Sequence, residues 1–320
     1  MITEKAMLVA VHSNVWTATK HDKDVSRKVA DQHGAHENAG RYNKKLLQQA
    51  AKLDAIRTLA GQIRTHVYKI TLPWSDEGYR ILPASLYFSL AEQMKDFERQ
   101  FYTAVDEFLA EYPAYIEQVR PALSGLFRPE DYPEPKKIRE KFGLRLEIKP
   151  IMTGEDFRVK LSEEHRARIS REIDADVRKL LAKGTQELWF RLRRLVDHMV
   201  TRLQQPDGRL YASVVDNIID LINVLPDLNL TNDPALNAFV EEIRRRLCTA
   251  TAKELKADDL LRATTAQEAA DIASRMAAHM EYGEAPGGVS TPPVDSLSPG
   301  TSHAASEDIF SQMAAYMGVQ

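Results

Sequence analysis

The chain has 320 residues, of which 43% are hydrophobic and 28% are charged, a composition typical of globular proteins with much helical surface. Its formal net charge of −3 argues against a protein that coats duplex DNA, because such proteins usually carry a basic excess. The single cysteine, Cys248, excludes an intramolecular disulfide and favours a reducing compartment. Without a long apolar run or a signal-like N-terminus, we expect a cytoplasmic protein that does not bind membranes.

The pattern of apolar residues predicts a mainly α-helical protein with a small antiparallel β element, an α+β fold with long, coiled-coil-like antiparallel helices. We expect a strand at 6–19, followed by a short helix between residues 20 and 45, capped by Asp24 and ended at Gly34. An amphipathic helix should follow at 44–69. A second helix should run from about residue 84 to 112 and end at Pro113.

The second half of the chain begins with a predicted β-hairpin at 144–161, because apolar and charged residues alternate on both sides of Pro150 and Gly154. A long helix is expected at 163–205, packed against the 84–112 helix. Shorter helices should lie at 211–224, at 234–249 with Asp233 as the cap, and at 265–281 with a capping box from Thr265 to Glu268.

The last 38 residues differ in composition from the rest of the chain. Between 283 and 305, fourteen of 23 residues are Gly, Pro, Ser or Thr, which predicts a flexible linker. Residues 306–320 turn apolar again, and they predict a short amphipathic helix. The expected organisation is therefore a helical body at 1–282, a linker at 283–305 and a terminal helix at 306–320.

A ten-residue peptide occurs twice near the end of the chain. Residues 271–280 (DIASRMAAHM) and 308–317 (DIFSQMAAYM) are identical at seven of ten positions. A short Met-rich helix on a flexible tether is suited to docking in an apolar groove, either on a second copy of the chain or on another protein. Its predicted protein-binding residues are Ile309, Phe310, Met313, Tyr316 and Met317.

Sequence motifs of catalysis are lacking. No phosphate-binding G-x-x-x-x-G-K-[ST] loop, no G-x-G-x-x-G, no G-x-S-x-G and no H-E-x-x-H motif occurs. His21, His33 and His36 share one polar stretch, but their spacing is typical of solvated loop residues and not of a standard metal site. We therefore expect no cofactor and no metal, and an enzyme assembled from distant residues is a third alternative.

Nucleic acid is the main alternative ligand. The segment 20–45 is locally basic, and aromatic residues flank it, a combination that can follow a single strand by phosphate contact and base stacking. The candidate residues for this role are Trp16, Lys20, Arg41, Tyr42, Lys44 and Lys45.

Several short motifs resemble a family of uncharacterised proteins encoded by phages and prophages. They include WTATK at 16–20, AGRYNK at 39–44, LPW at 72–74, RILPA at 80–84, DFRV at 156–159 and NLTNDP at 229–234. The resemblance covers residues 6–281 and implies a virus-encoded protein of the host cytoplasm, with no activity or site residues to transfer. Together these observations favour a self-associating, non-enzymatic scaffold or adaptor of a phage, with a single-strand-binding protein of phage replication or recombination as the alternative.

Overall fold

The structure is a computed structural model that describes residues 2–75, 78–205 and 210–282. It is mainly helical with one small antiparallel sheet and a short two-stranded ribbon, which confirms the predicted fold class. The chain forms two compact units, Met1–Met152 and Thr153–Gln320, where the sequence predicted a single body. The predicted linker and terminal helix lie outside the described residues.

The sheet of the first unit has β1 near its centre. Its strands follow the order β4 (Leu72–Pro73), β5 (Arg80–Pro83), β1 (Ala6–Asn14) and β6 (Gly143–Lys149), and each neighbouring pair is antiparallel. Leu8 pairs with Ile81 on one side of β1, and Val11 pairs with Leu146 on the other. The first strand therefore ends five residues earlier than predicted.

The predicted hairpin at 144–161 is wrong. Its first half forms β6, but the partner of β6 is β1, about 135 residues away in the sequence. Residues 157–161 belong to no strand, and Val159 and Leu161 are exposed. Alternation at 144–148 indicated a half-buried strand correctly, whereas the alternating residues 157–161 have no apolar surface to cover them.

The strands β2 (Thr19–His21) and β3 (Asn43–Lys45) form a two-stranded antiparallel ribbon. Helix α2 (Lys23–Gln32) lies between them in the sequence. The cap of α2 is Asp22, whose side chain accepts a hydrogen bond from the Val25 amide at 3.1 Å, and not Asp24 as predicted. Because residues 43–45 pair with β2, the next helix, α3 (Ala51–Lys69), starts later than predicted.

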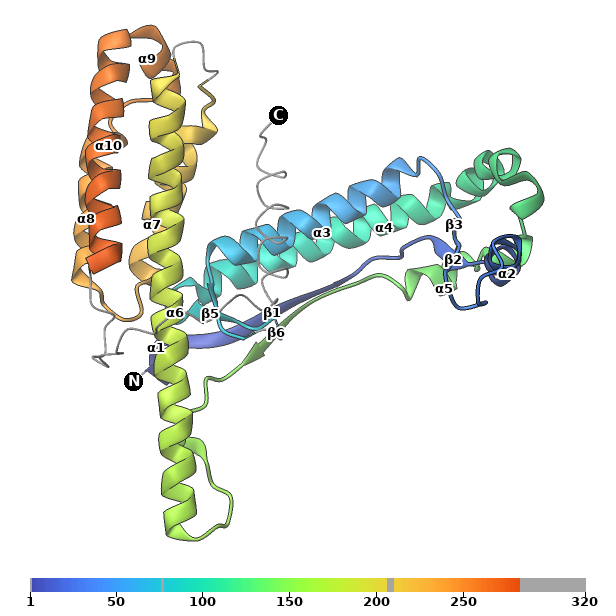
Figure 1. The fold of residues 1–320 in the computed structure, drawn as a ribbon, viewed down its shortest axis with the longest axis horizontal. Helices are drawn as coiled ribbons and strands as arrows, with labels where there is room; N and C mark the ends of the chain where they lie inside the picture. The colour runs from blue at the N-terminus through green and yellow to red at the C-terminus, as the bar shows by residue number, and fades with distance from the viewer. Residues whose placement is uncertain (1, 76–77, 206–209, 283–320) are drawn as a thin grey trace. The chain divides into compact units, whose positions relative to one another are not determined.

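Helices α3 and α4 (Tyr87–Leu123) lie side by side in the first unit (Figure 1). α4 continues through Pro113 and Pro121, where the sequence predicted its end. A proline removes one backbone hydrogen bond, but the buried residues Phe108, Tyr112 and Val119 hold the helix against the core on both sides of Pro113. The unit also contains the short helices α1 (Ile2–Lys5), η1 (Ala84–Leu86), η2 (Ser124–Leu126), η3 (Pro129–Asp131) and α5 (Pro135–Arg139).

The described part of the second unit is helical. It comprises η4 (Gly154–Asp156), α6 (Glu163–Gln204), α7 (Ser213–Leu228), α8 (Pro234–Leu247), α9 (Ala252–Ala257) and α10 (Asp259–Tyr282). α6 packs along α10 and α7, as Figure 1 shows, while α4 packs along α3. The predicted pairing of the 84–112 and 163–205 helices would join the two units, and it stays a prediction. Asp233 caps α8 as predicted.

α10 begins before the predicted capping box. Thr265 lies inside this helix, where its hydroxyl donates to the Leu261 carbonyl at 2.8 Å and caps nothing. Across the described residues, no helix combines the length and apolar character that crossing a lipid bilayer requires.

Candidate functional site

The six predicted nucleic-acid-binding residues have different environments in the structure. The Trp16 ring is 7% exposed and packs on Phe108 and Tyr112, with ring centroids 6.3 and 5.8 Å away. Lys44 is 1% exposed. Neither side chain can stack on a base or reach a phosphate, so the prediction is wrong for both.

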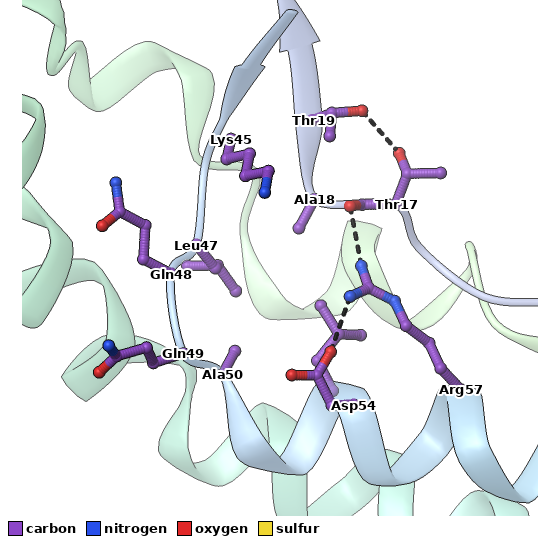
Figure 2. Close-up of a pocket in the computed structure, with 11 residues that line it drawn as sticks. Thr17, Ala18, Thr19, Lys45, Leu47, Gln48, Gln49, Ala50, Asp54 and Arg57 are labelled. Atoms are coloured by element: carbon purple, nitrogen blue, oxygen red, sulfur yellow. Dashed lines mark hydrogen bonds and ion pairs between the residues drawn. The ribbon is translucent and has the colours of Figure 1, made fainter. Parts of the chain in front are cut away.

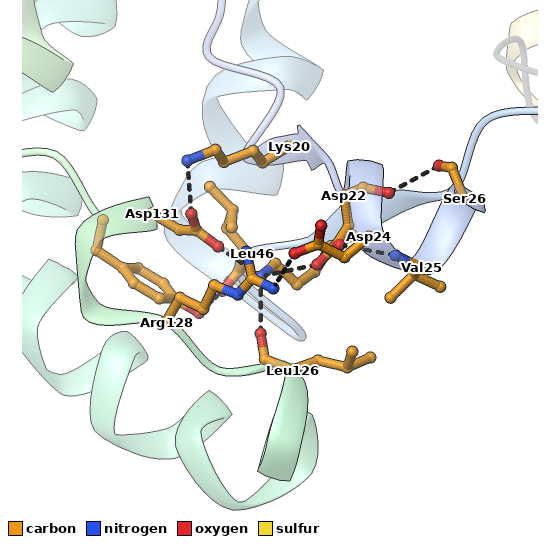
Figure 3. A network of polar contacts seen from close by, with 11 residues as sticks. Lys20, Asp22, Asp24, Val25, Ser26, Leu46, Leu126, Arg128 and Asp131 are labelled. Carbon is orange, nitrogen blue, oxygen red and sulfur yellow. Dashed lines mark hydrogen bonds and ion pairs between the residues drawn. The ribbon is translucent and has the colours of Figure 1, made fainter. Parts of the chain in front are cut away.

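Lys44 is the centre of a largely buried ionic group that we call the charged centre, formed by Lys20, Asp22, Lys44 and Asp131. Figure 3 labels Lys20, Asp22 and Asp131 of this group. The Lys44 ammonium lies 2.5 Å from Asp131 and 3.6 Å from Asp22, and it donates to the Leu126 carbonyl at 2.7 Å. The charged centre thereby ties the β2–β3 ribbon to the segment that follows α4.

Asp131 accepts hydrogen bonds from two lysines of the ribbon. The Lys20 ammonium donates to one oxygen at 2.6 Å, and the Lys44 ammonium approaches the other. Burial raises the pKa of Asp131, but the hydrogen bonds and positive charges of Lys20 and Lys44 outweigh it and leave the pKa below its ordinary value. The carboxylate therefore stays ionised in the folded unit at neutral pH.

Arg41, Tyr42 and Lys45 remain accessible. All three are exposed, and they lie at or just before β3. Three of the six predicted nucleic-acid-binding residues are thus exposed close together in the sequence, whereas the Lys20 ammonium already binds Asp131.

Beside Lys45 the surface is hollowed into a pocket of about 510 Å³ (Figure 2). Its walls come from the approach to β2, the end of β3 and the first turn of α3. The lining residues are Thr17, Ala18, Thr19, Lys45, Leu47, Gln48, Gln49, Ala50, Leu53, Asp54 and Arg57. Of these residues only Lys45 was predicted to bind a ligand, because the pocket joins residues from segments that are separate in the sequence.

Arg57 holds two walls of the pocket together. Its guanidinium donates to the Asp54 carboxylate at 2.8 Å and to the Thr17 carbonyl at 2.9 Å. The Thr19 hydroxyl donates to the Thr17 hydroxyl at 3.1 Å. Lys45 points from the opposite wall toward Ala18, whereas the side chains of Gln48 and Gln49 point away from the pocket (Figure 2).

A second candidate site lies in the second unit, where the first copy of the repeated peptide packs. We call the surface on which it packs, formed by α6 and α8 with Trp189 and Phe239, the α10 groove. Ile272 and Met276 of the peptide are fully buried, and α10 contacts both α6 and α8. The His279 ring lies on Trp189, with centroids 4.7 Å apart, and 6.3 Å from Phe239. One face of the 271–280 peptide is therefore a docked surface.

Ion pairs at the edge of the α10 groove form what we call the rim network, made of Glu242, Arg246, Asp271 and Arg275. Asp271 accepts from Arg246 at 3.0 Å, and Glu242 accepts from Arg275 at 2.5 Å. The Arg275 guanidinium also lies over the Phe239 ring, 5.6 Å from its centroid. Hydrogen bonds from these arginines lower the pKa of both Glu242 and Asp271 below their ordinary values.

The repeat's second copy, with Ile309, Phe310, Met313, Tyr316 and Met317, lies outside the described residues. Within them, no three His, Cys, Asp or Glu side chains gather in a way that could hold a metal ion, and His21 is hydrogen-bonded to Ser26 at 3.0 Å. Cys248 is half-buried, and burial raises the pKa of its thiol, which disfavours a reactive thiolate.

Comparison with protein-family models, with curated proteins and with solved structures found no match to this chain. The pocket beside Lys45 offers a cationic, partly apolar hollow, and the α10 groove offers a surface that already holds one copy of a duplicated peptide.

Proposed function

We propose that the protein is a non-enzymatic, self-associating adaptor, in which residues 308–317 of one copy dock in the α10 groove of another. The packing of the 271–280 peptide carries this proposal, because most residues that contact the groove have an identical or similar counterpart in the second copy. The resemblance to phage-encoded proteins suggests that such an adaptor acts during infection.

Four contact positions correspond between the two peptides. They are Asp271 and Asp308, Ile272 and Ile309, Met276 and Met313, and His279 and Tyr316. The copy thus retains an acid for Arg246, two apolar side chains for the buried positions and an aromatic ring for Trp189. Docking an amphipathic helix in this way requires only side chains that the tail possesses.

Residues 271–280 are called the resident peptide below, and residues 308–317 the copy. Two sequence differences between them affect which peptide occupies the α10 groove. Gln312 replaces Arg275, so the copy loses the ion pair with Glu242 and the cation–π contact with Phe239. Each is worth at most about 1 kcal/mol at an exposed site. Phe310 replaces the half-buried Ala273 and adds apolar surface. We therefore expect the resident peptide to hold the groove in a dilute monomer and the copy to enter at higher concentration.

Two measurements test whether residues 308–317 of one copy replace residues 271–280 in the α10 groove of another. Light scattering after size exclusion should show a concentration-dependent mass for the full chain that is lost on truncation after residue 305 or in Ile309→Asp/Met313→Asp, because an apolar groove excludes charges. A labelled 306–320 peptide should bind the truncated chain, and a peptide with Ile309→Asp and Met313→Asp should not bind it.

The matched control is Arg168→Gln, which removes an ion pair on the same unit, with Glu172 at 2.8 Å, far along α6 from Trp189. It should leave peptide binding unchanged. The proposal is refuted if truncation and substitution both leave the mass from light scattering unchanged and the labelled peptide does not bind.

Single-strand binding remains a second candidate, because Arg41, Tyr42 and Lys45 are exposed together. Changing Arg41 and Lys45 to Ala should flatten the salt dependence of any single-strand affinity by about one unit for each lost phosphate contact. Lys44, as a buried residue, makes no such contribution.

A further inference from the structure

The pocket beside Lys45 has an apolar floor and a polar edge. Ala18, Leu47, Ala50 and Leu53 are all buried and form the floor. Polar groups come from Thr19, Lys45, Asp54 and Arg57 at the edge. An apolar base with a few converging polar groups is the usual form of a small-molecule site, and about 510 Å³ lies within the usual range of volumes.

The charges of the pocket favour an anion. Lys45 is exposed and forms no ion pair with another described residue, in contrast to its buried neighbour Lys44. Arg57 shares its charge with Asp54, but its guanidinium has five N–H donors, and the contacts with Asp54, Thr17 and Trp16 leave some of them free. Two cations therefore face one carboxylate.

The backbone of the pocket is held in an unusual conformation on both sides. Ala18 and Gln49 each have φ of 53°, and they are two of the four non-glycine residues with positive φ in the described chain. The Ala18 carbonyl accepts from the Leu46 amide at 2.7 Å, which holds the two walls together. Strained backbone that the surrounding structure maintains is common at binding sites, and here it occurs at two residues that line the pocket.

We propose that this pocket binds a phosphate-bearing ligand of nucleotide size. The phosphate would lie between Lys45, the hydroxyl of Thr17 and the free donors of Arg57, and the ring of the ligand would cover the apolar floor. A free mononucleotide and a nucleotide within a single strand present the same chemistry. The site is independent of the docking peptide, so either can fail without the other.

The test measures binding of thymidine monophosphate by calorimetry and of a labelled oligothymidylate of about 12 nucleotides by anisotropy, both on the full chain. Lys45→Ala should weaken binding about tenfold, because a charge-assisted hydrogen bond is lost. Thr17→Val, which removes the hydroxyl that accepts from Thr19, should weaken it less. Lys136→Ala, an exposed lysine on α5, is the matched control, and thermal melts should show that all three variants fold.

Binding of the mononucleotide that depends on Lys45 supports a free nucleotide as the ligand, and binding of the oligonucleotide alone supports a strand. In the latter case the salt slope should fall by about one unit in Lys45→Ala. The proposal is overturned if neither probe binds at millimolar concentration, or if Lys45→Ala binds as tightly as Lys136→Ala.

Discussion

The charged centre of the first unit and the rim network of the second are both groups of ion-paired side chains, but they differ in their exposure to solvent. Each joins two cations to two carboxylates. Lys44 and Asp131 have side chains only 1% and 4% exposed, whereas Arg275 and Asp271 are 45% and 47% exposed. Water therefore screens the pair of Arg275 and Asp271 but hardly reaches the pair of Lys44 and Asp131.

That difference assigns the two groups different roles. A buried ion whose partner is lost stays desolvated without compensation, so the three buried members of the charged centre, Asp22, Lys44 and Asp131, are each required for the local fold. An exposed pair contributes little to stability and can be broken at small cost. The rim network can therefore bias which peptide occupies the α10 groove without determining whether the unit folds.

The largest predicted effect comes from Lys44→Met. This substitution leaves Asp22 and Asp131 buried without their shared cation and should lower the free energy of unfolding of the first unit by about 3–5 kcal/mol. Denaturant titration followed by circular dichroism measures the loss.

Lys20→Met is the matched control, because Lys20 binds the same carboxylate but its side chain is 50% exposed. Its cost should be about 1 kcal/mol or less. Equal losses for the two variants would contradict the comparison, since burial would then not decide the outcome.

A smaller effect is predicted on acidification. The pKa of Asp131 is lower in the folded unit than its ordinary value of 3.8, so its contribution to stability is complete above that value and is lost as pH falls through the folded pKa. The unfolding midpoint of the wild type should thus fall steeply below about pH 4. Asp131→Asn should be less stable at neutral pH and show a flatter acid slope. An unchanged slope in this variant would exclude Asp131 as a source of acid sensitivity.

Much of the fold follows from local signals. The three-four spacing of apolar residues indicated α3 and α6, and Asp233 before Pro234 indicated the start of α8. These features depend on residues within a few positions of one another, where period and capping act directly. The ends of α4 were missed because tertiary packing retains the helix through its prolines.

The sites were less predictable because they depend on distant partners. Lys44 and Lys45 are neighbours in a basic stretch, and only the pairing of Lys44 with Asp131, 87 positions away, buries one and leaves the other exposed. The strand of three residues is too short to show an alternation of buried and exposed side chains. The peptide repeat, by contrast, was visible in the sequence, but the Trp189 and Phe239 surface under its first copy was not.

The smallest effect on stability, and the sharpest test of the rim network, is predicted for Arg275→Gln. The substitution gives the resident peptide the residue that the copy has at position 312, and it removes the contacts with Glu242 and Phe239. The unit should lose about 1 kcal/mol or less, because these contacts are exposed. Docking of the copy competes with the resident peptide, so the same free energy should raise exchange up to about fivefold. Light scattering at one fixed concentration should therefore show a heavier species than the wild type. Truncation after residue 305 should abolish the increase, and Arg168→Gln should not produce it. An Arg275→Gln chain that loses stability but keeps the wild-type mass would mean that the two peptides do not compete for the same groove.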